Sequence, residues 1–394
     1  MKRITIVGDI MCERPILHAG KQADGSYDFR PIFEQVKPMF AKSDYVIGNM
    51  EFPVGGEELT YGDSFFVFNA PDAYAEAIKD AGIDLVSTIN NHTLDRGFEG
   101  AVRTMQTLDK LGLPYVGTCL PDQERQEAYY FELDGVKFAV IAYTYGINKR
   151  KPEDEKYADS MNCLAKAGNR VCGKKIYPKS VFDKLIKNEN RRERIKKRLH
   201  IPTLPIQVDT LINHDMVYEY TERFCDDLKA AKEKADFVIC YPHTGGQFNI
   251  EIGDFTKTVF DKALACGADT ILASHSHCVQ KAEFRDAVPC AYSLGNFNMV
   301  GDTEVTVKKF FPDYGLAMHL YMDGKRLGKV TFSITKAIMK DNEQIVVWPV
   351  DALYNSFKCK RQKKNLLKEV KQILAVVTGE EYSSDVIQAE YDLK

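Results

Sequence analysis

Short apolar runs recur along the first three quarters of the chain, and each ends at a polar or glycine-rich turn. Apolar runs of this length, bounded by turn residues, predict buried strands. The runs are Ile4–Val7, Tyr45–Gly48, Leu85–Ile89, Phe138–Tyr143, Phe237–Tyr241, Thr270–Ala273 and Cys290–Ser293.

Helical patterns separate several of these runs, because Leu, Ile, Phe and Ala recur there at steps of three and four residues. The predicted helices are Pro31–Ala41, Pro71–Ala81, Phe98–Leu111, Met216–Ala235 and Phe255–Cys266. Helices that alternate with buried strands predict an α/β fold with parallel pairing. Around Asp134-Gly135, in contrast, two flanking strand patterns predict a hairpin.

The chain after Gly295 changes to longer segments in which apolar and polar residues alternate. We expect these segments to form antiparallel strands that close a second sheet. They are followed by a tail with one predicted helix, so we assign residues 1–350 to one domain and 351–394 to a C-terminal helical extension. The three segments and the helix are Leu316–Met322, Lys329–Lys336, Gln344–Val350 and Asn365–Val377.

A segment at about residues 148–214 interrupts the alternation of strands and helices and carries the basic run Arg191–Arg198. We interpret the segment as a surface insertion. The basic run is either a solvated helix face or a contact surface for an anionic polymer or nucleic acid.

Charge and composition narrow the class of protein. The chain has 53 Lys and Arg against 56 Asp and Glu, a formal net charge of −3, so no overall attraction draws it to nucleic acid or anionic lipid. Its ten cysteines form no C-x-x-C pair and several lie in apolar runs, as buried free thiols do. We find no signal peptide and no apolar stretch of membrane-spanning length, and we therefore predict a cytoplasmic protein.

Polar side chains with the capacity to bind a metal follow nearly every predicted strand. Strand ends of a parallel sheet meet at one edge, where ligand sites form. Asp9 is alternatively a helix cap and His243 alternatively a core histidine. His275 and His277 are the stronger signal, because alternate residues of an extended segment point to one side. The oxygen and nitrogen donors predict one or two divalent ions, Mn, Fe or Zn.

Six motifs carry a family resemblance: GDI, GNMEFPV, NNHTLDRG, HTGGQF, SHSHCVQ and YSLGNF, in this order from Gly8 to Phe297. The sequence resembles the poly-gamma-glutamate capsule biosynthesis proteins of the CapA type, whose fold is similar to that of calcineurin-like metallophosphatases. The resemblance implies a four-layer α/β/β/α sandwich with mixed sheets, interrupted by the basic insertion and followed by the helical tail.

The resemblance also implies roles for individual residues. Asp9 and His277 match ligands of one metal, and Glu51 matches the group that bridges the two metals. Asn91, His243 and His275 match ligands of the second metal. His92 matches the histidine that assists the leaving group, and Asp95 either orients His92 or caps a helix. We expect Arg14, Asn49 and Asn296 to bind substrate, although Arg14 is alternatively part of a surface salt bridge.

Two departures from the metallophosphatase pattern bear on this expectation. Met11 stands where those proteins have a histidine, which implies weaker binding of the first metal, a water-rich site or a single-metal enzyme. Thr244 replaces the tryptophan of the family's His-Trp-Gly motif, which changes the contacts expected with substrate.

The resemblance implies a metal-dependent, phosphoesterase-like hydrolase that acts on an anionic polymer or a phosphoester, with metal-activated hydroxide as the nucleophile. The alternative is a non-catalytic component that binds polymer or assists assembly in poly-gamma-glutamate synthesis on the same fold. Nucleic-acid binding is the least favoured function, because no aromatic platform accompanies the basic run.

Overall fold

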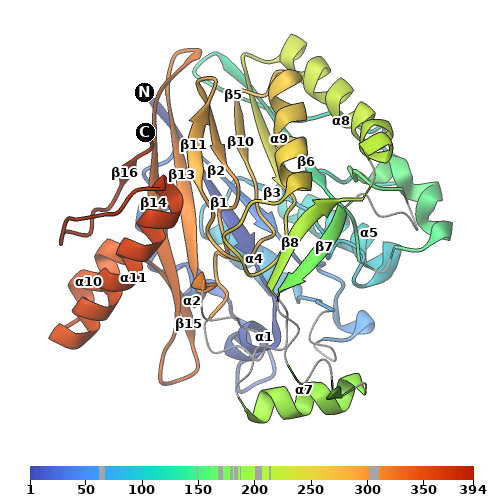
Figure 1. Cartoon of the computed structure of the whole chain (residues 1–394). Helices are drawn as coiled ribbons and strands as arrows, with labels where there is room; N and C mark the ends of the chain where they lie inside the picture. Colours follow the sequence, from blue (N-terminus) through green and yellow to red (C-terminus); the bar gives the residue numbers. More distant parts are fainter. Residues whose placement is uncertain are drawn as a thin grey trace.

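The structure is a computed structural model of the whole chain (Figure 1). It describes all residues except 62–66, 149, 167–171, 178–180, 182–184, 187, 200–205, 213 and 301–309. The strands are β1 (Lys2–Ile10), β2 (Tyr45–Met50), β3 (Leu85–Ser87), β4 (Tyr115–Val116), β5 (Tyr129–Leu133), β6 (Val136–Thr144), β7 (Cys172–Tyr177), β8 (Ile206–Leu211), β9 (Phe237–His243), β10 (Thr270–Leu272), β11 (Ala282–Arg285), β12 (Val288–Ala291), β13 (Tyr314–Asp323), β14 (Arg326–Met339), β15 (Ile345–Pro349) and β16 (Tyr391–Asp392). The helices are α1 (Arg14–Gly20), α2 (Arg30–Phe33), α3 (Lys37–Phe40), α4 (Asp72–Asp80), α5 (Gly97–Leu111), α7 (Glu189–Arg198), α8 (His214–Lys234), α9 (Asp254–Ala265), α10 (Val350–Ser356) and α11 (Lys360–Thr378), with short 3₁₀ helices at Glu57–Leu59 and Pro152–Ser160.

The described strands form two large mixed sheets and a separate hairpin. The first sheet has the order β15-β14-β13-β1-β2-β3-β4, with β16 added beside β14. The second has the order β11-β12-β10-β9-β6-β5, and β7 pairs with β8. Strands β1 to β4 are parallel to one another, as are β6, β9, β10 and β12. The parallel strands bring their carboxyl ends to one edge of each sheet.

The expectation that the C-terminal strands close a second sheet is wrong. Strand β13 pairs antiparallel with β1, from Lys2↔Met322 to Val7↔Ala317, and β14 and β15 extend this first sheet. An alternating pattern identifies a strand and its buried face, but it carries no information on which distant edge accepts the strand's hydrogen bonds. The second sheet is instead built from β5, β6 and β9 to β12.

Alternation along the central strands produces four layers. On β6, Phe138 and Val140 pack with Ile6 of β1 in a core between the two sheets. Ala139 and Ile141 point the other way and pack against α8 and α9. Both faces of such a strand are buried, which explains its nearly continuous apolar run. Figure 1 shows α8 and α9 covering the outer side of the second sheet.

The first sheet shows the same division. Ile47 of β2 belongs to the core between the sheets, whereas its neighbour Val46 packs with residues of α1 to α4 on the outer face. The order helices, sheet, sheet, helices is the predicted α/β/β/α sandwich, so the predicted fold class is confirmed.

Most predicted helices are confirmed with small shifts of their ends, but the helix predicted over Pro31–Ala41 is wrong. That segment forms two short helices, α2 and α3, each with a proline in its first turn. Pro38 has no N–H to donate to a preceding carbonyl, so it starts a new helix and cannot continue the previous one. The Asp134-Gly135 hairpin is confirmed, because β5 pairs antiparallel with β6 on either side of it. Both turn residues have positive φ angles, 49° and 78°.

The described arginines of the basic run in the insertion are exposed, whereas the helix of the C-terminal tail packs into the core. Helix α7 contains the basic run, and the described side chains of Arg191, Arg194 and Arg198 are exposed. Helix α11, in contrast, buries Val370 and Leu374 in the core that also contains Phe332 of β14. The division at residue 350 remains a prediction.

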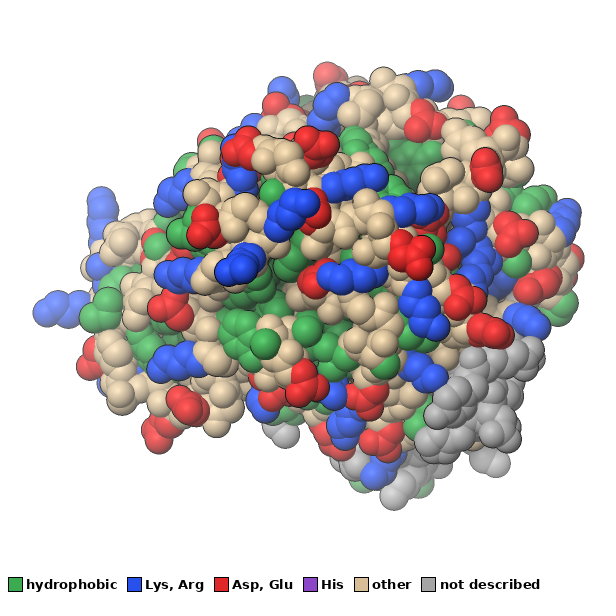
Figure 2. Space-filling view, turned by 90° about the horizontal axis from the view of Figure 1, so that it is seen from above, with side chains coloured by type: hydrophobic (Ala, Val, Ile, Leu, Met, Phe, Trp, Pro, Cys, Tyr) green, Lys and Arg blue, Asp and Glu red, His purple; other side chains and the backbone are tan. Residues whose placement is uncertain are grey.

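The charged side chains on the surface and the free cysteines are distributed as the composition predicts. Lysine, arginine and carboxylate side chains are interspersed over the face shown in Figure 2. All ten cysteines are free, and six of them are buried. Within the described part of the chain, no helix combines the length and the apolar character needed to cross a bilayer.

Candidate metal centre

The carboxyl ends of four strands bring these predicted ligands together. Asp9 lies near the end of β1, and Glu51 follows β2 directly. His243 is the last residue of β9, while His275 and His277 lie in the loop after β10. All five side chains are buried, with 0 to 4% of their surface exposed. These residues come from distant parts of the sequence and meet because their strands are neighbours in two packed sheets.

Glu51 is at the centre of the cluster. One of its oxygens, Oε1, lies 3.4 Å from His243 Nε2 and 3.9 Å from His277 Nε2. Among the described residues, two groups have the donor types and the spacing to hold a metal ion. One is Glu51, His243 and His275; the other is Asp9, Glu51 and His277. Glu51 belongs to both, as expected of a bridging ligand.

The donor set fits divalent metal ions. Neither carboxylate oxygen of Glu51 has a hydrogen-bond partner, although both are buried, and His275 Nε2 also lacks a partner. A buried polar atom without a partner costs about 1–3 kcal/mol, and more when it is charged. Cations would compensate this cost, and mixed carboxylate and imidazole donors suit Zn, Mn or Fe.

Two histidines, His243 and His275, are held in the neutral form that binds a metal. Burial lowers the pKa of His243 to about 4, with a smaller opposing effect from Asp9. Burial also lowers the pKa of His275 well below the usual value, and the neighbouring His243 adds to this effect. Burial, followed by the charge of Asp9, raises the pKa of Glu51 well above its usual value. Neutral imidazoles have a free nitrogen to bind a metal, and a bound cation would favour the ionised carboxylate of Glu51.

A buried histidine elsewhere in the first sheet shows what a structural histidine looks like. His319 Nδ1 lies 2.9 Å from Thr5 Oγ1, and its Nε2 lies 3.0 Å from Ser333 Oγ. Both ring nitrogens therefore have polar partners. His275 differs in its unpartnered Nε2, so its environment is that of a ligand and not that of a satisfied core residue.

The backbone around the centre is unusual for the residue types present. His275 and His277 have positive φ angles of 109° and 55°, a region that side chains with a Cβ rarely adopt. Gly8 precedes Asp9, and a Cβ there would lie only 2.0 Å from the carbonyl oxygen of Gly295. The absence of a side chain allows the Asp9 N–H to donate to that carbonyl at 3.0 Å. Strain of this kind persists only where surrounding contacts enforce it, and it concentrates at functional sites.

His92 and Asp95 form a pair at the rim of the cluster. His92 Nδ1 lies 2.7 Å from Asp95 Oδ2, and the other ring nitrogen, Nε2, lies 3.9 Å from Glu51 Oε1. The ring of Phe68 stacks on the imidazole, with 4.2 Å between centroids. Asp95 does not cap α5, whose N-cap residue is Arg96. The contact favours the interpretation in which Asp95 orients His92.

The three asparagines of the predicted set all contact the ligands. Asn91 Oδ1 lies 2.6 Å from His243 Nε2. Asn49 donates to Asp9 Oδ1 at 2.7 Å, and Asn296 Oδ1 lies 2.8 Å from His277 Nδ1. Hydrogen bonds of this kind orient metal ligands. A direct substrate role for Asn49 and Asn296 remains a prediction, as does ligation by Asn91.

The positions that depart from the metallophosphatase pattern are structurally well defined. Met11 is buried in the apolar cluster of α1 to α4, and its backbone carbonyl accepts from the Tyr74 hydroxyl at 2.8 Å. Thr244 is buried, and its hydroxyl has no partner. Arg14 is the half-buried first residue of α1, and its substrate role remains a prediction.

Tyr145 was not foreseen from the sequence. Its ring centroid lies 4.7 Å from that of His275, and its N–H donates to the His243 carbonyl at 3.0 Å. The residue directly follows β6, so the rule that ligand sites form after parallel strands was the signal that pointed to it.

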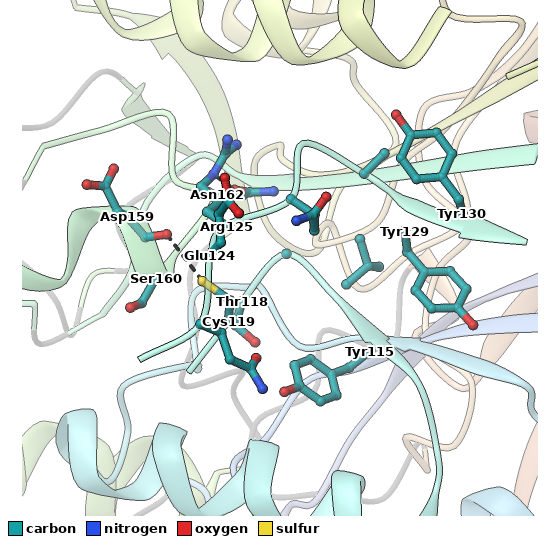
Figure 3. Close-up of a pocket in the computed structure, with 15 residues that line it drawn as sticks. Tyr115, Thr118, Cys119, Glu124, Arg125, Tyr129, Tyr130, Asp159, Ser160 and Asn162 are labelled. Atoms are coloured by element: carbon teal, nitrogen blue, oxygen red, sulfur yellow. Dashed lines mark hydrogen bonds between the residues drawn. The ribbon is translucent and has the colours of Figure 1, made fainter. Parts of the chain in front are cut away.

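A separate hollow of about 390 Å³ lies between β4 and β5, at the edges of the two sheets (Figure 3). Its cation, Arg125, donates to Asp227 Oδ1 at 3.1 Å, to Asn162 Oδ1 at 3.0 Å and to the Tyr143 hydroxyl at 3.0 Å. The Tyr143 hydroxyl in turn donates to Asp227 Oδ2 at 2.6 Å. The charge of Arg125 is therefore paired within the protein, which indicates a structural role for this residue.

We expect the substitution Arg125→Met to destabilise the fold by about 3–5 kcal/mol, because it leaves the largely buried Asp227 carboxylate without its cation. Urea unfolding measures the effect. The matched control Arg285→Met removes a pair in which the side chain of Asp261 is 61% exposed, and it should cost about 1 kcal/mol or less. Equal effects of the two substitutions would contradict the structural role of Arg125.

The sequence and the structure are similar to those of known proteins. The sequence profile of a family described as bacterial capsule synthesis protein PGA_cap matches residues 3–300. The capsule biosynthesis protein CapA of Bacillus anthracis is 23% identical over 297 residues, which make up 75% of this chain and 59% of that protein. The PGA biosynthesis protein CapA of Bacillus subtilis (strain 168) is 24% identical over 296 residues, 74% of this chain and 62% of that protein. The chain thus spans about three fifths of the length of these relatives.

Among solved structures, the 5'-nucleotidase of Candida albicans SC5314 is similar over 94% of this chain and 56% of its own, with a TM-score of 0.43 and 11% identity.

Proposed function

Because this chain belongs to the family of bacterial capsule synthesis proteins described as PGA_cap, we propose that it is a metal-dependent, phosphoesterase-like hydrolase of the CapA type. The observation that carries the proposal is the buried Glu51 carboxylate, which lacks hydrogen-bond donors and lies among imidazoles. The substrate class is an anionic polymer or a phosphoester. One relative is named a PGA biosynthesis protein, so poly-gamma-glutamate is the first polymer to test.

In this proposal the two groups around Glu51 each hold one ion. Asp9, Glu51 and His277 would hold the first ion, and Glu51, His243 and His275 would hold the second, with Asn91 as a further ligand. When bound, the ions supply Lewis-acid charge for the substrate oxygens and activate a water molecule. Asn49 and Asn296 keep Asp9 and His277 in place through the hydrogen bonds described above.

His92 acts as the general acid. Asp95 holds the proton on Nδ1 and fixes the orientation of the ring, so that Nε2 faces the side of the cluster where Glu51 lies. Nε2 donates its proton to the departing oxygen of the substrate, and this transfer removes the developing negative charge from the leaving group. Phe68 restricts the rotation of the ring from one face.

Met11 favours a second candidate function, a non-catalytic component that binds polymer or assists assembly. Its thioether is packed in the apolar cluster of α1 to α4, in the position where metallophosphatases have a histidine. A site with fewer ligands holds its metal less firmly, and a binding role does not require turnover. In that case the variant His92→Ala would support the cellular role of the protein fully.

Metal binding is the first test of the proposed function. After gentle purification we expect one to two Mn²⁺ ions per chain, an increase of the melting temperature when Mn²⁺ is added to the chelated protein, and hydrolysis of p-nitrophenyl phosphate. At a metal concentration about a thousandfold above Kd, the stabilisation amounts to about 4 kcal/mol. Elemental analysis and a thermal shift measure these effects. No bound metal and no hydrolysis in the presence of Mn²⁺ would overturn the proposal.

A further inference from the structure

The insertion at about residues 148–214 contains a hairpin that packs against a loop of the candidate metal centre. Strands β7 and β8 form the hairpin, which Figure 1 shows beside α9. The N–H of Gln207 in β8 donates to the Gln247 carbonyl, at 2.8 Å, in the loop that follows His243. A Cβ on Gly246 would lie only 2.0 Å from the Gln207 carbonyl oxygen, so glycine allows the close contact.

A second contact fixes the hairpin to α9, the helix that follows this loop. Asp209 of β8 is buried, and its Oδ2 accepts from the Thr256 N–H of α9 at 2.7 Å. Asp209 is the direct partner of Lys174 across the hairpin. Residues that lie opposite each other on antiparallel strands project to the same face. The register therefore places Lys174 on the same face of the hairpin as Asp209, which contacts α9.

The side chain of Lys174 contacts the centre through Tyr145. Its Nζ lies 5.5 Å from the centroid of the Tyr145 ring, within cation–π range, and this ring lies 4.7 Å from the ring of His275. The two contacts keep the ammonium within roughly 10 Å of the His275 ring, about one Debye length at 0.1 M salt.

The Lys174 side chain is also exposed to solvent. A solvent-exposed cation that contacts the centre through Tyr145 is well placed to attract an anion that enters from solution.

We propose that Lys174, positioned by the insertion hairpin and Tyr145, is a specificity-determining residue that binds an anionic group of the substrate beside the candidate metal centre. The group is a phosphate or a carboxylate, two anions with the same oxygen-donor chemistry. This inference rests on the proposed function for its substrate, but the binding of an anion can be measured without turnover. It also gives the insertion a role that does not depend on the basic run of α7.

The chain offers a matched control. Lys175 is the next residue of β7 and is also exposed, but side chains of consecutive strand residues point to opposite faces. The substitution Lys175→Met removes the same charge from the same strand without removing the group next to Tyr145. Lys174→Arg keeps the cation, and Lys174→Met removes it.

Calorimetry in the presence of Mn²⁺, with inorganic phosphate and glutarate as separate probes, tests the proposal. We expect Lys174→Met to weaken the binding of at least one anion about fivefold, since a partly exposed ion pair contributes up to about 1 kcal/mol. Lys174→Arg and Lys175→Met should bind like the wild type. The anion whose affinity changes identifies the group that Lys174 recognises.

Hydrolysis of p-nitrophenyl phosphate provides a second readout, in which Lys174→Met should raise KM more than it lowers kcat. If the wild type binds anions but does not hydrolyse the ester, the hydrolase function fails and the role of Lys174 is still decided by calorimetry. Equal affinities in Lys174→Met and the wild type, equal losses in the Lys174 and Lys175 variants, or no anion binding by the wild type would overturn the inference.

Discussion

Replacing Glu51 by glutamine is expected to abolish metal binding and to lower kcat/KM by about a thousandfold or more, because both groups of candidate ligands lose the carboxylate that they share. The metal-free variant should be at least as stable as the metal-free wild type. In the wild type, burial and the charge of Asp9 raise the pKa of Glu51, and this buried acid has no hydrogen-bond donor. A neutral amide removes the repulsion from Asp9.

Metal content and melting temperature, each measured with and without Mn²⁺, check this prediction. The wild type should gain stability when Mn²⁺ is added, and the Glu51→Gln variant should not. Glu13 offers a matched control, since it is also a buried glutamate whose pKa burial raises, to about 7, and it belongs to neither group of candidate ligands. Glu13→Gln should keep the response to metal. Full metal content in Glu51→Gln would show that Glu51 is not a ligand.

Replacing His92 by glutamine should lower kcat by about 10²- to 10⁴-fold while the metal content stays that of the wild type, because general acid catalysis contributes an effect of this size. Its ring contacts Asp95 through Nδ1, and Nε2 is directed toward Glu51 at 3.9 Å. The loss should be greatest for substrates with poor leaving groups, since these depend most on protonation.

Asp95→Asn separates orientation from proton transfer. We expect a smaller loss of kcat than in His92→Gln, because the imidazole remains but its tautomer and direction are less well defined. His18, an exposed histidine of α1, serves as the control, and His18→Gln should behave like the wild type. An unchanged kcat in His92→Gln would remove His92 from the chemistry.

The two tests together distinguish the two candidate functions. A hydrolase loses activity in both variants, and only Glu51→Gln loses its metal. A polymer-binding component that uses metal for structure would respond to Glu51→Gln in stability and would tolerate His92→Gln. The buried Met11 is compatible with either outcome, since it removes one candidate donor and leaves Glu51, Asp9 and His277 in place.

Local patterns predicted much of the fold. The apolar run of β6 is buried on both faces, and its short length excluded a long helix. The positive φ angles of Asp134 and Gly135 follow from residue types that favour such turns. The prediction for Pro31–Ala41 failed because apolar spacing was given more weight than Pro38, which has no N–H to continue a helix.

The predictions about the candidate metal centre depended on where the parallel strands end, and not on local apolar patterns. Residues at the ends of parallel strands were expected to meet, and Asp9, Glu51, His243, His275 and His277 do lie together. Their roles as ligands remain predictions until metal is measured. Sequence reasoning missed Lys174, because the segment that contains it did not match the family motifs and was interpreted only through its basic run.

The sequence by itself determined which chemistry is available: carboxylate, amide and imidazole groups after buried strands, in an α/β chain with near-neutral charge. The tertiary structure alone decided that β13 to β15 extend the first sheet, because strand pairing between distant segments depends on which edges are free and carries no local signal. It also decided that Lys174 lies near His275, since a hairpin far along the chain packs against the loop after His243. Contacts of this kind arise from packing and pairing between segments that no local pattern connects.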